Sequence, residues 1–447
     1  MPGYVLNLTL NLDRIFTLLA MVSTKGLVME LEKYSIGIGD RFGREGAAQL
    51  RALQAAQNAG VFVVPVWNKS NREHVIIGTG PEDARREADE AVRVCKWQAS
   101  YYVDADHIGL ATVDRFIAPS DFFTIDVADA IGKPAAPDAL ASFVGAMAPY
   151  RGMLQVPTLP EPFVVSKETI EATGRKYLHA VQEAGAVYRH IAGRKGDGQF
   201  VPEVSFDEAG EPQTPVELFF ILAAIAREGI PIQTIAPKFT GAFLKGIDYV
   251  GEVSRFEREF NDDLAVIAHA VSVFLLPKNL KLSVHSGSDK FALYPVIHRA
   301  LKKTHAGLHL KTAGTTWLEE VIGLAAAGGD GLKAAKEIYA ASFKRYDELC
   351  RPYLSVIDID RTKLPLPATV NAWSSQDYVH ALQHDQSRKE FNIHFRQLVH
   401  VGYKVAAEMG KRFQALLGEC RPSIEANVTE NILERHIRPL FIGASAK

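Results

Sequence analysis

Short apolar segments alternate with longer amphipathic segments along the chain from residue 29 onward. Eight short runs rich in β-branched or aromatic residues are candidate strands: 35–39, 61–66, 101–105, 122–127, 232–236, 281–285, 307–311 and 354–358. The segments between them have helical periodicity, and several end in a glycine that suits a helix C-cap. Buried strands that alternate with helices are typical of a parallel sheet, and eight such units predict an α/β fold of the (β/α)8 TIM-barrel type. The alternative is an open, doubly wound sheet. Its dinucleotide-binding version is disfavoured because no GxGxxG motif follows the first candidate strand.

The connection after the fourth candidate strand is much longer than the others. It contains a proline-rich segment, a long helical pattern and the acidic, turn-rich stretch "DGQFVPEVSFDEAGEPQTP". We interpret residues 134–214 as an insertion that covers one end of a barrel domain spanning residues 29–363. Residues 364–447 predict a mostly helical C-terminal extension packed on that barrel. We interpret Met29 as the natural start and residues 1–28 as an extension of little structural consequence.

Composition narrows the class of function. The 447 residues are 47% hydrophobic and 23% charged, with a formal net charge of −2, which disfavours binding to nucleic acid or to an anionic membrane. The three cysteines lie far apart and form no CxxC motif, which argues against a disulfide framework or a thiolate metal site. We therefore expect a cytoplasmic enzyme whose partner is a small molecule, with a homo-oligomer compatible with the sequence.

Polar side chains follow every candidate strand, and in a (β/α)8 barrel the active site lies at the carboxyl ends of the strands. The charged groups at or just after strand ends include Arg41, Asp104, Asp106, His107, Asp126, Lys238, His285, His309, Lys311 and Asp358. Helix N-caps also favour aspartate, so one such residue has little meaning, whereas charged groups at all eight ends predict a functional site.

His285 and His309 end two consecutive candidate strands. A single histidine at a strand end is most often a core residue. If both side chains point into the barrel, however, the two imidazoles lie within reach of one cation. Imidazole nitrogen suits Zn, Ni, Co or Mn, and Glu252 or Asp126 could supply a carboxylate ligand.

Three further segments have both a structural and a functional interpretation. Asp289 and Lys290 open a helix, where they could cap it or bind a sugar. Thr312 lies where a strand passes into a helix, at a turn that could bind an oxyanion or be an ordinary βα turn. His400 lies between Arg396 and Lys404 on one helical face, which is either solvated or folded across the barrel mouth.

Several long motifs occur together in this order: "SIGIGDRFG", "PKFTGAFLKGIDYVGE", "SVHSGSDKF", "HLKTAGTTWLEE" and "RQLVHVGYKVAAE". With them the sequence resembles the tagaturonate epimerase family from about residue 29 to residue 420. That family interconverts tagaturonate and fructuronate, and some members act as tagatose 4-epimerases on the neutral ketohexoses tagatose and fructose. The resemblance implies a metal-dependent sugar epimerase on a (β/α)8-type scaffold, with no nicotinamide or flavin.

Such an epimerase inverts a carbon that is β to the ketone, whose hydrogen is not acidic, so we expect retro-aldol cleavage and re-addition. The metal candidates are then Glu252, His285 and His309, and the proton-transfer candidates are Asp126 and Lys311. The substrate-binding candidates are Arg41, Lys238, Asp289, Lys290, Thr312 and His400.

Other chemistries fit the same residues. A Schiff base on Lys238 or Lys311 would support aldol chemistry without a metal. A ketose–aldose isomerase or an aldolase would use the same barrel and metal, and a non-enzymatic sugar-binding protein belongs to a different class.

Overall fold

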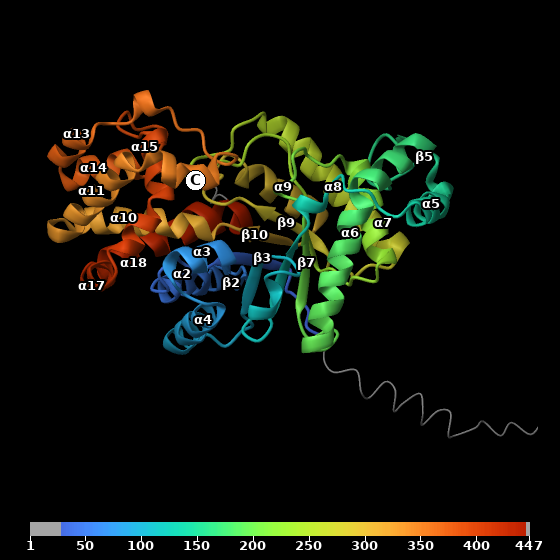
Figure 1. Ribbon diagram of the computed structural model, residues 1–447, viewed down its shortest axis with the longest axis horizontal. Coiled ribbons are helices and arrows are strands. Elements are labelled where there is room, and N and C mark those ends of the chain that lie inside the picture. The colour runs from blue at the N-terminus through green and yellow to red at the C-terminus, as the bar shows by residue number, and fades with distance from the viewer. Residues whose placement is uncertain (1–27, 444–447) are drawn as a thin grey trace, which may run out of the picture.

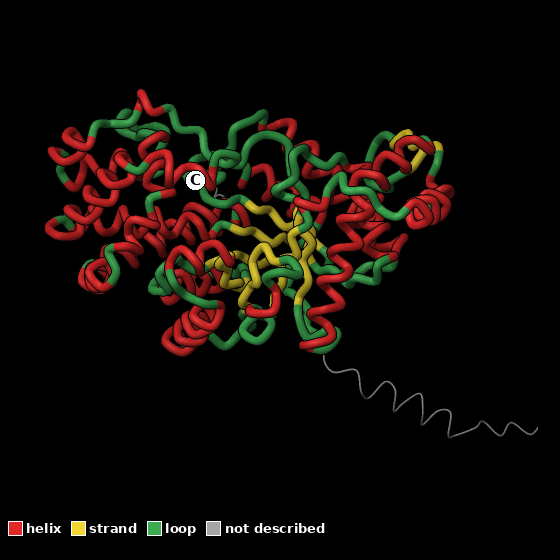
Figure 2. Tube along the Cα trace, viewed as in Figure 1, coloured by secondary structure: helices red, strands yellow, loops and turns green. Residues whose placement is uncertain are grey.

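A computed structural model describes residues 28–443, and the proposed extension at residues 1–28 falls almost entirely outside this range. Eight parallel strands form a closed barrel in the order β1-β10-β9-β8-β7-β4-β3-β2, which confirms the predicted fold class. Figure 2 shows the strands together at the centre of the molecule with helices on both sides. The barrel strands are β1 (Tyr34–Ile38), β2 (Val64–Ser70), β3 (Tyr102–Ile108), β4 (Phe122–Asp126), β7 (Val201–Ser205), β8 (Thr234–Ala236), β9 (Lys281–His285) and β10 (Leu308–Lys311).

Seven of the eight predicted strands are present, and the eighth prediction, 354–358, is wrong. That segment is a loop after a 3-10 turn (Arg351–Tyr353), and its Leu354 is 69% exposed. The missing strand is β7, which pairs with β4 and β8 and lies within the segment predicted as an insertion. Pro202 and Glu203 concealed it, because a proline and a charge inside five residues are unusual in a central strand.

Helices surround the barrel (Figure 1). The outer helices are α2 (Gly46–Asn58), α3 (Asn71–Ile77), α4 (Pro81–Cys95), α6 (Lys167–Lys195), α7 (Pro215–Arg227), α8 (Val253–Phe274) and α9 (Tyr294–Thr304). The π-helix η7 (Asn431–Ile442) packs against both α9 and α2, so the end of the described chain completes the ring. The helix that crosses from β4 to β7 is α6, which leaves α5 (Pro137–Ala146) and the β5–β6 hairpin (Gly152–Leu154, Phe163–Val165) as the actual insertion.

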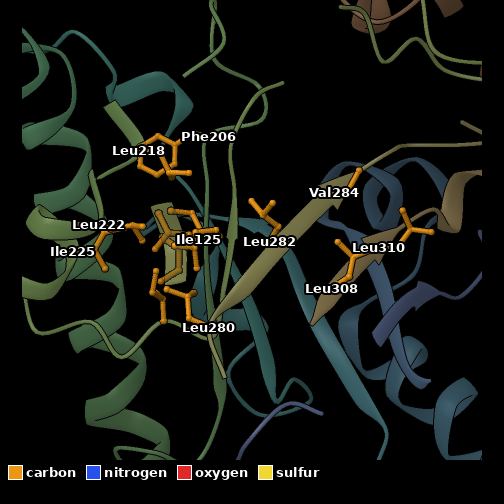
Figure 3. Close-up of a cluster of buried hydrophobic side chains, with 14 of the residues drawn as sticks. Ile125, Phe206, Leu218, Leu222, Ile225, Leu280, Leu282, Val284, Leu308 and Leu310 are labelled. Atoms are coloured by element: carbon orange, nitrogen blue, oxygen red, sulfur yellow. The ribbon is translucent and has the colours of Figure 1, made fainter. Parts of the chain in front are cut away.

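The strand side chains divide into an apolar outer face and a layered inner face. Figure 3 shows Leu282, Val284, Leu308 and Leu310 among the buried side chains between strands and helices, where each contributes roughly 1.5–3 kcal/mol. The alternating residues point inward. An apolar cluster that includes Val66, Tyr102, Phe122 and Val201 fills one end of the interior, and polar residues follow further along the same strands. The barrel is therefore sealed at its amino-terminal end and polar at its carboxyl-terminal end.

The C-terminal helices have a hydrophobic core of their own, which includes Trp317, Tyr339 and Phe395. This region lies on the opposite side of the barrel from α5 and β5 (Figure 1). Its helices are α10 (Thr316–Ala327), α11 (Gly329–Lys344), α12 (Tyr346–Cys350), α13 (Pro367–Ala372), α14 (Ser375–Leu382), α15 (Ile393–Val401), α16 (Tyr403–Glu408), α17 (Lys411–Glu419) and α18 (Arg421–Glu430). Among residues 28–443, no helix combines the length and the apolar character that crossing a membrane requires.

Candidate active site

A buried lysine occupies the centre of the polar layers. Lys311 Nζ lies 2.7 Å from Asp104 Oδ2, 2.8 Å from Asp106 Oδ1 and 3.3 Å from Glu203 Oε1, and it also donates to Thr124 Oγ1. Burial alone would lower the pKa of Lys311, but the three carboxylates outweigh it and raise that pKa well above its usual value. Burial raises the pKa of Asp104 to about 7, whereas Lys311 contributes to lowering that of Asp106 to about 2 despite burial. The lysine is therefore a fixed cation within a group of acids.

His285 lies beside this lysine on the neighbouring strand, between two carboxylates. Its Nε2 hydrogen-bonds Glu203 Oε1 at 2.9 Å, and its Nδ1 lies 3.1 Å from Asp207 Oδ2. The second contact does not have hydrogen-bond geometry, so Nδ1 is a buried nitrogen without a hydrogen-bond partner. Burial would lower the pKa of His285, but Asp207 and Glu203 raise it to about 9. One nitrogen therefore orients the ring, and the other could ligate a metal that displaces its proton.

His107 is held in a strained backbone conformation at the end of β3. The β3–β4 register shifts between Ala105 and Ile108, and His107 has a φ of 52° in the left-handed region. A non-glycine residue there costs about 1–2 kcal/mol, and such strain clusters at functional sites. The irregularity directs the ring toward the barrel mouth, where Nδ1 hydrogen-bonds Asp126 Oδ2 at 2.9 Å and the ring centroid lies 5.4 Å from that of His285.

Within residues 28–443, His107, Asp207 and His285 form a group of side chains that could hold a metal ion. Each offers one ligand atom, and these atoms all lie within 4.8 Å of one another. Each histidine also binds a carboxylate through its other nitrogen, which is how proteins commonly orient metal-binding imidazoles. Five carboxylates face Lys311 and the two imidazoles in this region, an excess of negative charge that a divalent cation would balance. The donor set therefore fits a divalent metal.

Comparison with known proteins assigns this chain to a family. A model of the tagaturonate epimerase family matches residues 5–440. The chain belongs to this family. The match confirms the resemblance found in the sequence motifs, and because epimerases are isomerases, the chain is an isomerase-class enzyme.

Individual proteins resemble this chain in sequence or in fold. The tagaturonate/fructuronate epimerase of Thermotoga maritima is 28% identical over 381 residues, which are 83% of this chain and 72% of that protein. Two crystal structures of the fructuronate-tagaturonate epimerase UxaE from Cohnella laeviribosi share the fold. At 23% identity, a glycerol complex and the native form give TM-scores of 0.76 and 0.75, each covering 92% of this chain and 82% of the other.

Two of the metal ligands predicted for this tagaturonate epimerase family member do not join His285. Strand pairing places His285 beside Lys311 and His309 beside Ser283, so His309 lies one inward-facing layer deeper. There its Nδ1 hydrogen-bonds Ser35 Oγ at 2.8 Å, and burial lowers its pKa to about 3. Glu252 is the N-cap residue of α8, and its side chain makes no capping hydrogen bond and is 66% exposed.

Three of the predicted substrate-binding residues make buried contacts that stabilise the fold of this epimerase: Asp289, Lys290 and Thr312. Asp289 is completely buried and accepts hydrogen bonds from Arg396 NH2 at 2.8 Å, His384 Nδ1 at 3.0 Å and Thr315 Oγ1. Lys290 and Thr312 are also held by buried contacts. Lys290 Nζ donates to the carbonyl oxygens of Leu244 and Ile247 at 3.0 and 2.9 Å, and Thr312 Oγ1 lies 3.2 Å from His436 Nε2. Burial lowers the pKa of Lys290 to about 7. These contacts fasten the C-terminal helices and the β8–α8 loop to the barrel.

The remaining predicted residues lie around the mouth of the barrel. Lys238 Nζ donates to the carbonyl oxygen of Ala209. Arg41 lies 3.2 Å from Glu73 Oε1 and stacks on Tyr403, with its guanidinium carbon 4.4 Å from the ring centroid. His400 is 1% exposed, and neither of its ring nitrogens has a hydrogen-bond partner.

Sequence reasoning missed Glu203 and Asp207 and gave His107 no role. The first two belong to β7 and the turn after it, and they were lost with that strand. The sequence of β7 does contain a signal that could have identified it. Its inward positions are Val201, Glu203 and Ser205, and those of β4 are Phe122, Thr124 and Asp126, so in both strands an apolar residue is followed by two polar ones. His107 was visible at a strand end, but its strained backbone was not.

Proposed function

We propose that this enzyme interconverts tagaturonate and fructuronate by a metal-dependent reaction. Family membership and the 28% identical relative from Thermotoga maritima support the substrate pair. The convergence of His107, Asp207 and His285 at the mouth of the barrel is the observation that carries the proposed metal dependence.

The two sugar acids differ at a hydroxyl-bearing carbon that is β to the ketone, so removal of a proton from that carbon is not assisted. In the proposed retro-aldol route, a base takes the proton of the β-hydroxyl, whose C–O bond becomes a carbonyl. The electrons of the bond between the α and β carbons move toward the ketone, and the bond breaks. The aldehyde fragment turns its other face, the bond re-forms, and the proton returns to oxygen.

The metal site would consist of His107, Asp207 and His285, with Asp126 and Glu203 orienting the two histidines. Two nitrogen ligands and one oxygen ligand suit Zn, Ni, Co or Mn. A bound divalent cation supplies Lewis-acid stabilisation of negative charge that develops on the ketone oxygen.

We assign proton transfer to Asp104 and Asp106, which the Lys311 ammonium holds at 2.7 and 2.8 Å, and a positioning role to Asp126. Asp106 has a 12% exposed side chain, faces the mouth and is kept ionised beside Lys311. Asp104, with a pKa near 7, lies on the same amine and can exchange a proton near neutral pH. Asp126 is engaged with His107, which supports orientation of a ligand rather than direct proton transfer.

Lys311 is a poor Schiff-base nucleophile in this environment. Three carboxylates raise its pKa, so the amine stays protonated, whereas imine formation needs the neutral form. This environment supports the metal-dependent route over the lysine route.

The test is incubation of metal-replete enzyme with D-fructuronate, followed by chromatographic detection of tagaturonate. We expect turnover that a chelator abolishes and that added divalent metal restores. His285→Ala should lose activity and metal binding, whereas His179→Ala, at a half-buried histidine on α6, is the matched control. Full activity of the chelated enzyme would contradict the metal-dependent route, and an aldose or three-carbon fragments as sole products would contradict epimerisation. Parallel incubation with D-fructose tests whether the neutral ketohexoses are also substrates.

A further inference from the structure

A lysine at the mouth of the barrel has no partner for its charge. Lys245 lies in the loop between β8 and α8, and its backbone N–H donates to the carbonyl oxygen of Val356 at 2.8 Å. Within residues 28–443 its Nζ takes part in no hydrogen bond or ion pair. A Cβ atom placed on Gly287 would lie 3.7 Å from this Nζ. The amine therefore lies over the turn that begins directly after His285.

Two further nitrogen-bearing side chains gather at the neighbouring turn after β10. Arg41 NH1 donates to the carbonyl oxygen of Gly314 at 3.5 Å, and a Cβ atom placed on Gly314 would lie 3.5 Å from His400 Cε1. The same Cβ atom would collide with the carbonyl oxygen of Gly287, so the two glycine turns are in direct contact. Lys245, Arg41 and His400 thus surround one pair of turns, next to the strand ends that carry His285 and Lys311.

The charges around this point are mostly positive. Burial lowers the pKa of His400 well below its usual value, and Arg41, Lys245 and other nearby cations lower it further. The imidazole is therefore neutral and has one N–H to donate. Two acids, Glu73 and Glu208, also interact electrostatically with Lys245. Glu73, however, already forms an ion pair with Arg41 at 3.2 Å. An unpaired ammonium beside a guanidinium is unfavourable in a partly buried position, and a bound anion would remove that cost.

We propose that Lys245, together with Arg41 and His400, binds the carboxylate of a hexuronate substrate and sets the preference for the sugar acid over the neutral ketohexose. The inference rests on the proposed function, because a uronate has a carboxylate where the neutral ketohexose has a hydroxymethyl group. A carboxylate at this position would accept charge-assisted hydrogen bonds from Lys245 and Arg41 and one from the neutral His400.

The test measures dissociation constants by isothermal titration calorimetry for D-fructuronate and D-fructose, using metal-replete wild type, Lys245→Met, Lys245→Arg and the control Lys278→Met at an exposed lysine. We expect Lys245→Met to weaken fructuronate binding roughly 10- to 100-fold, as for loss of one hydrogen bond between charged groups. Fructose binding should change much less, and Lys245→Arg should regain most of the loss. Unchanged fructuronate binding in Lys245→Met would overturn the inference while leaving the proposed function intact. Wild type that binds fructuronate in a Lys245-dependent way but does not epimerise it would support this subsite and contradict the proposed function.

A measurement on the wild-type protein guards against a variant that does not fold. Trace acetylation with acetic anhydride, followed by peptide mass spectrometry, reports the accessibility of each amine. Fructuronate should protect Lys245 and leave Lys278 unaffected, and fructose at the same occupancy should protect Lys245 less. Equal labelling of Lys245 with and without saturating fructuronate would overturn the inference.

Discussion

Replacement of His107 by glycine and by alanine tests whether the proposed metal site stores backbone strain. Both substitutions remove the imidazole and its hydrogen bond to Asp126, so this loss cancels when the two variants are compared. They differ in the backbone: at a φ of 52°, alanine keeps a cost of about 1–2 kcal/mol that glycine does not have. Glycine loses more conformational entropy on folding, about 0.5–1 kcal/mol. The expected outcome is that His107→Gly is at least as stable as His107→Ala, by a margin of about 0–1.5 kcal/mol.

The assay is urea denaturation followed by circular dichroism, with chelator present so that metal binding does not contribute. Ala105 on the same strand provides a matched control, because it is fully buried and lies outside the left-handed region. Ala105→Gly should follow the usual order and destabilise the protein by at least about 0.5–1 kcal/mol. Both His107 variants should lose fructuronate epimerisation by more than the about 10- to 100-fold that loss of an outer-shell partner costs, because they remove a proposed metal ligand. If His107→Ala proved more stable than His107→Gly by about 0.5–1 kcal/mol, the usual order expected at Ala105, the strain would not be present in solution.

Two other buried charges give predictions of the same kind. Lys311→Met removes the cation shared by Asp104, Asp106 and Glu203 and should lower the free energy of unfolding at pH 7 by about 3–5 kcal/mol; thermal melting checks this, and an unchanged melting temperature would contradict the ion network. Asp289→Asn breaks the buried ion pair with Arg396 and should lower the free energy of unfolding at neutral pH by a similar amount. Arg396 and His384 hold the pKa of Asp289 well below its usual value despite burial, so the carboxylate stabilises the fold above the unfolded-state pKa of about 4, and this stability is lost as the pH falls through the lower folded-state value. Urea denaturation from pH 8 downward measures the difference in free energy of unfolding between wild type and Asp289→Asn. This difference should be constant above about pH 5 and shrink in acid. A difference that stays constant down to pH 3 would show that the carboxylate is not the source of the stability.

The amino-acid sequence alone predicts the barrel because most of its strands have an apolar outer face that helices must cover. Hydrophobic periodicity is local, so strands such as 281–285 and 307–311 are visible without knowledge of their neighbours. The same alternation directs His285 and Lys311 inward at strand ends, where the structure finds both. β7 was not predicted, because two of its inward positions carry polar residues of the barrel interior and its five residues give too short a hydrophobic pattern.

Only the tertiary structure decides which of these polar groups meet. Closing the barrel sets the register that places Lys311 beside His285 and moves His309 one layer deeper, and register depends on all eight strands at once. Asp289 and Arg396 are more than a hundred residues apart in sequence, and their pairing depends on how the C-terminal helices fold back over the barrel. The sequence thus specifies where polar side chains emerge from the sheet, because that depends on neighbours along the chain. Their partners and charge states depend on contacts between distant segments, which only packing creates.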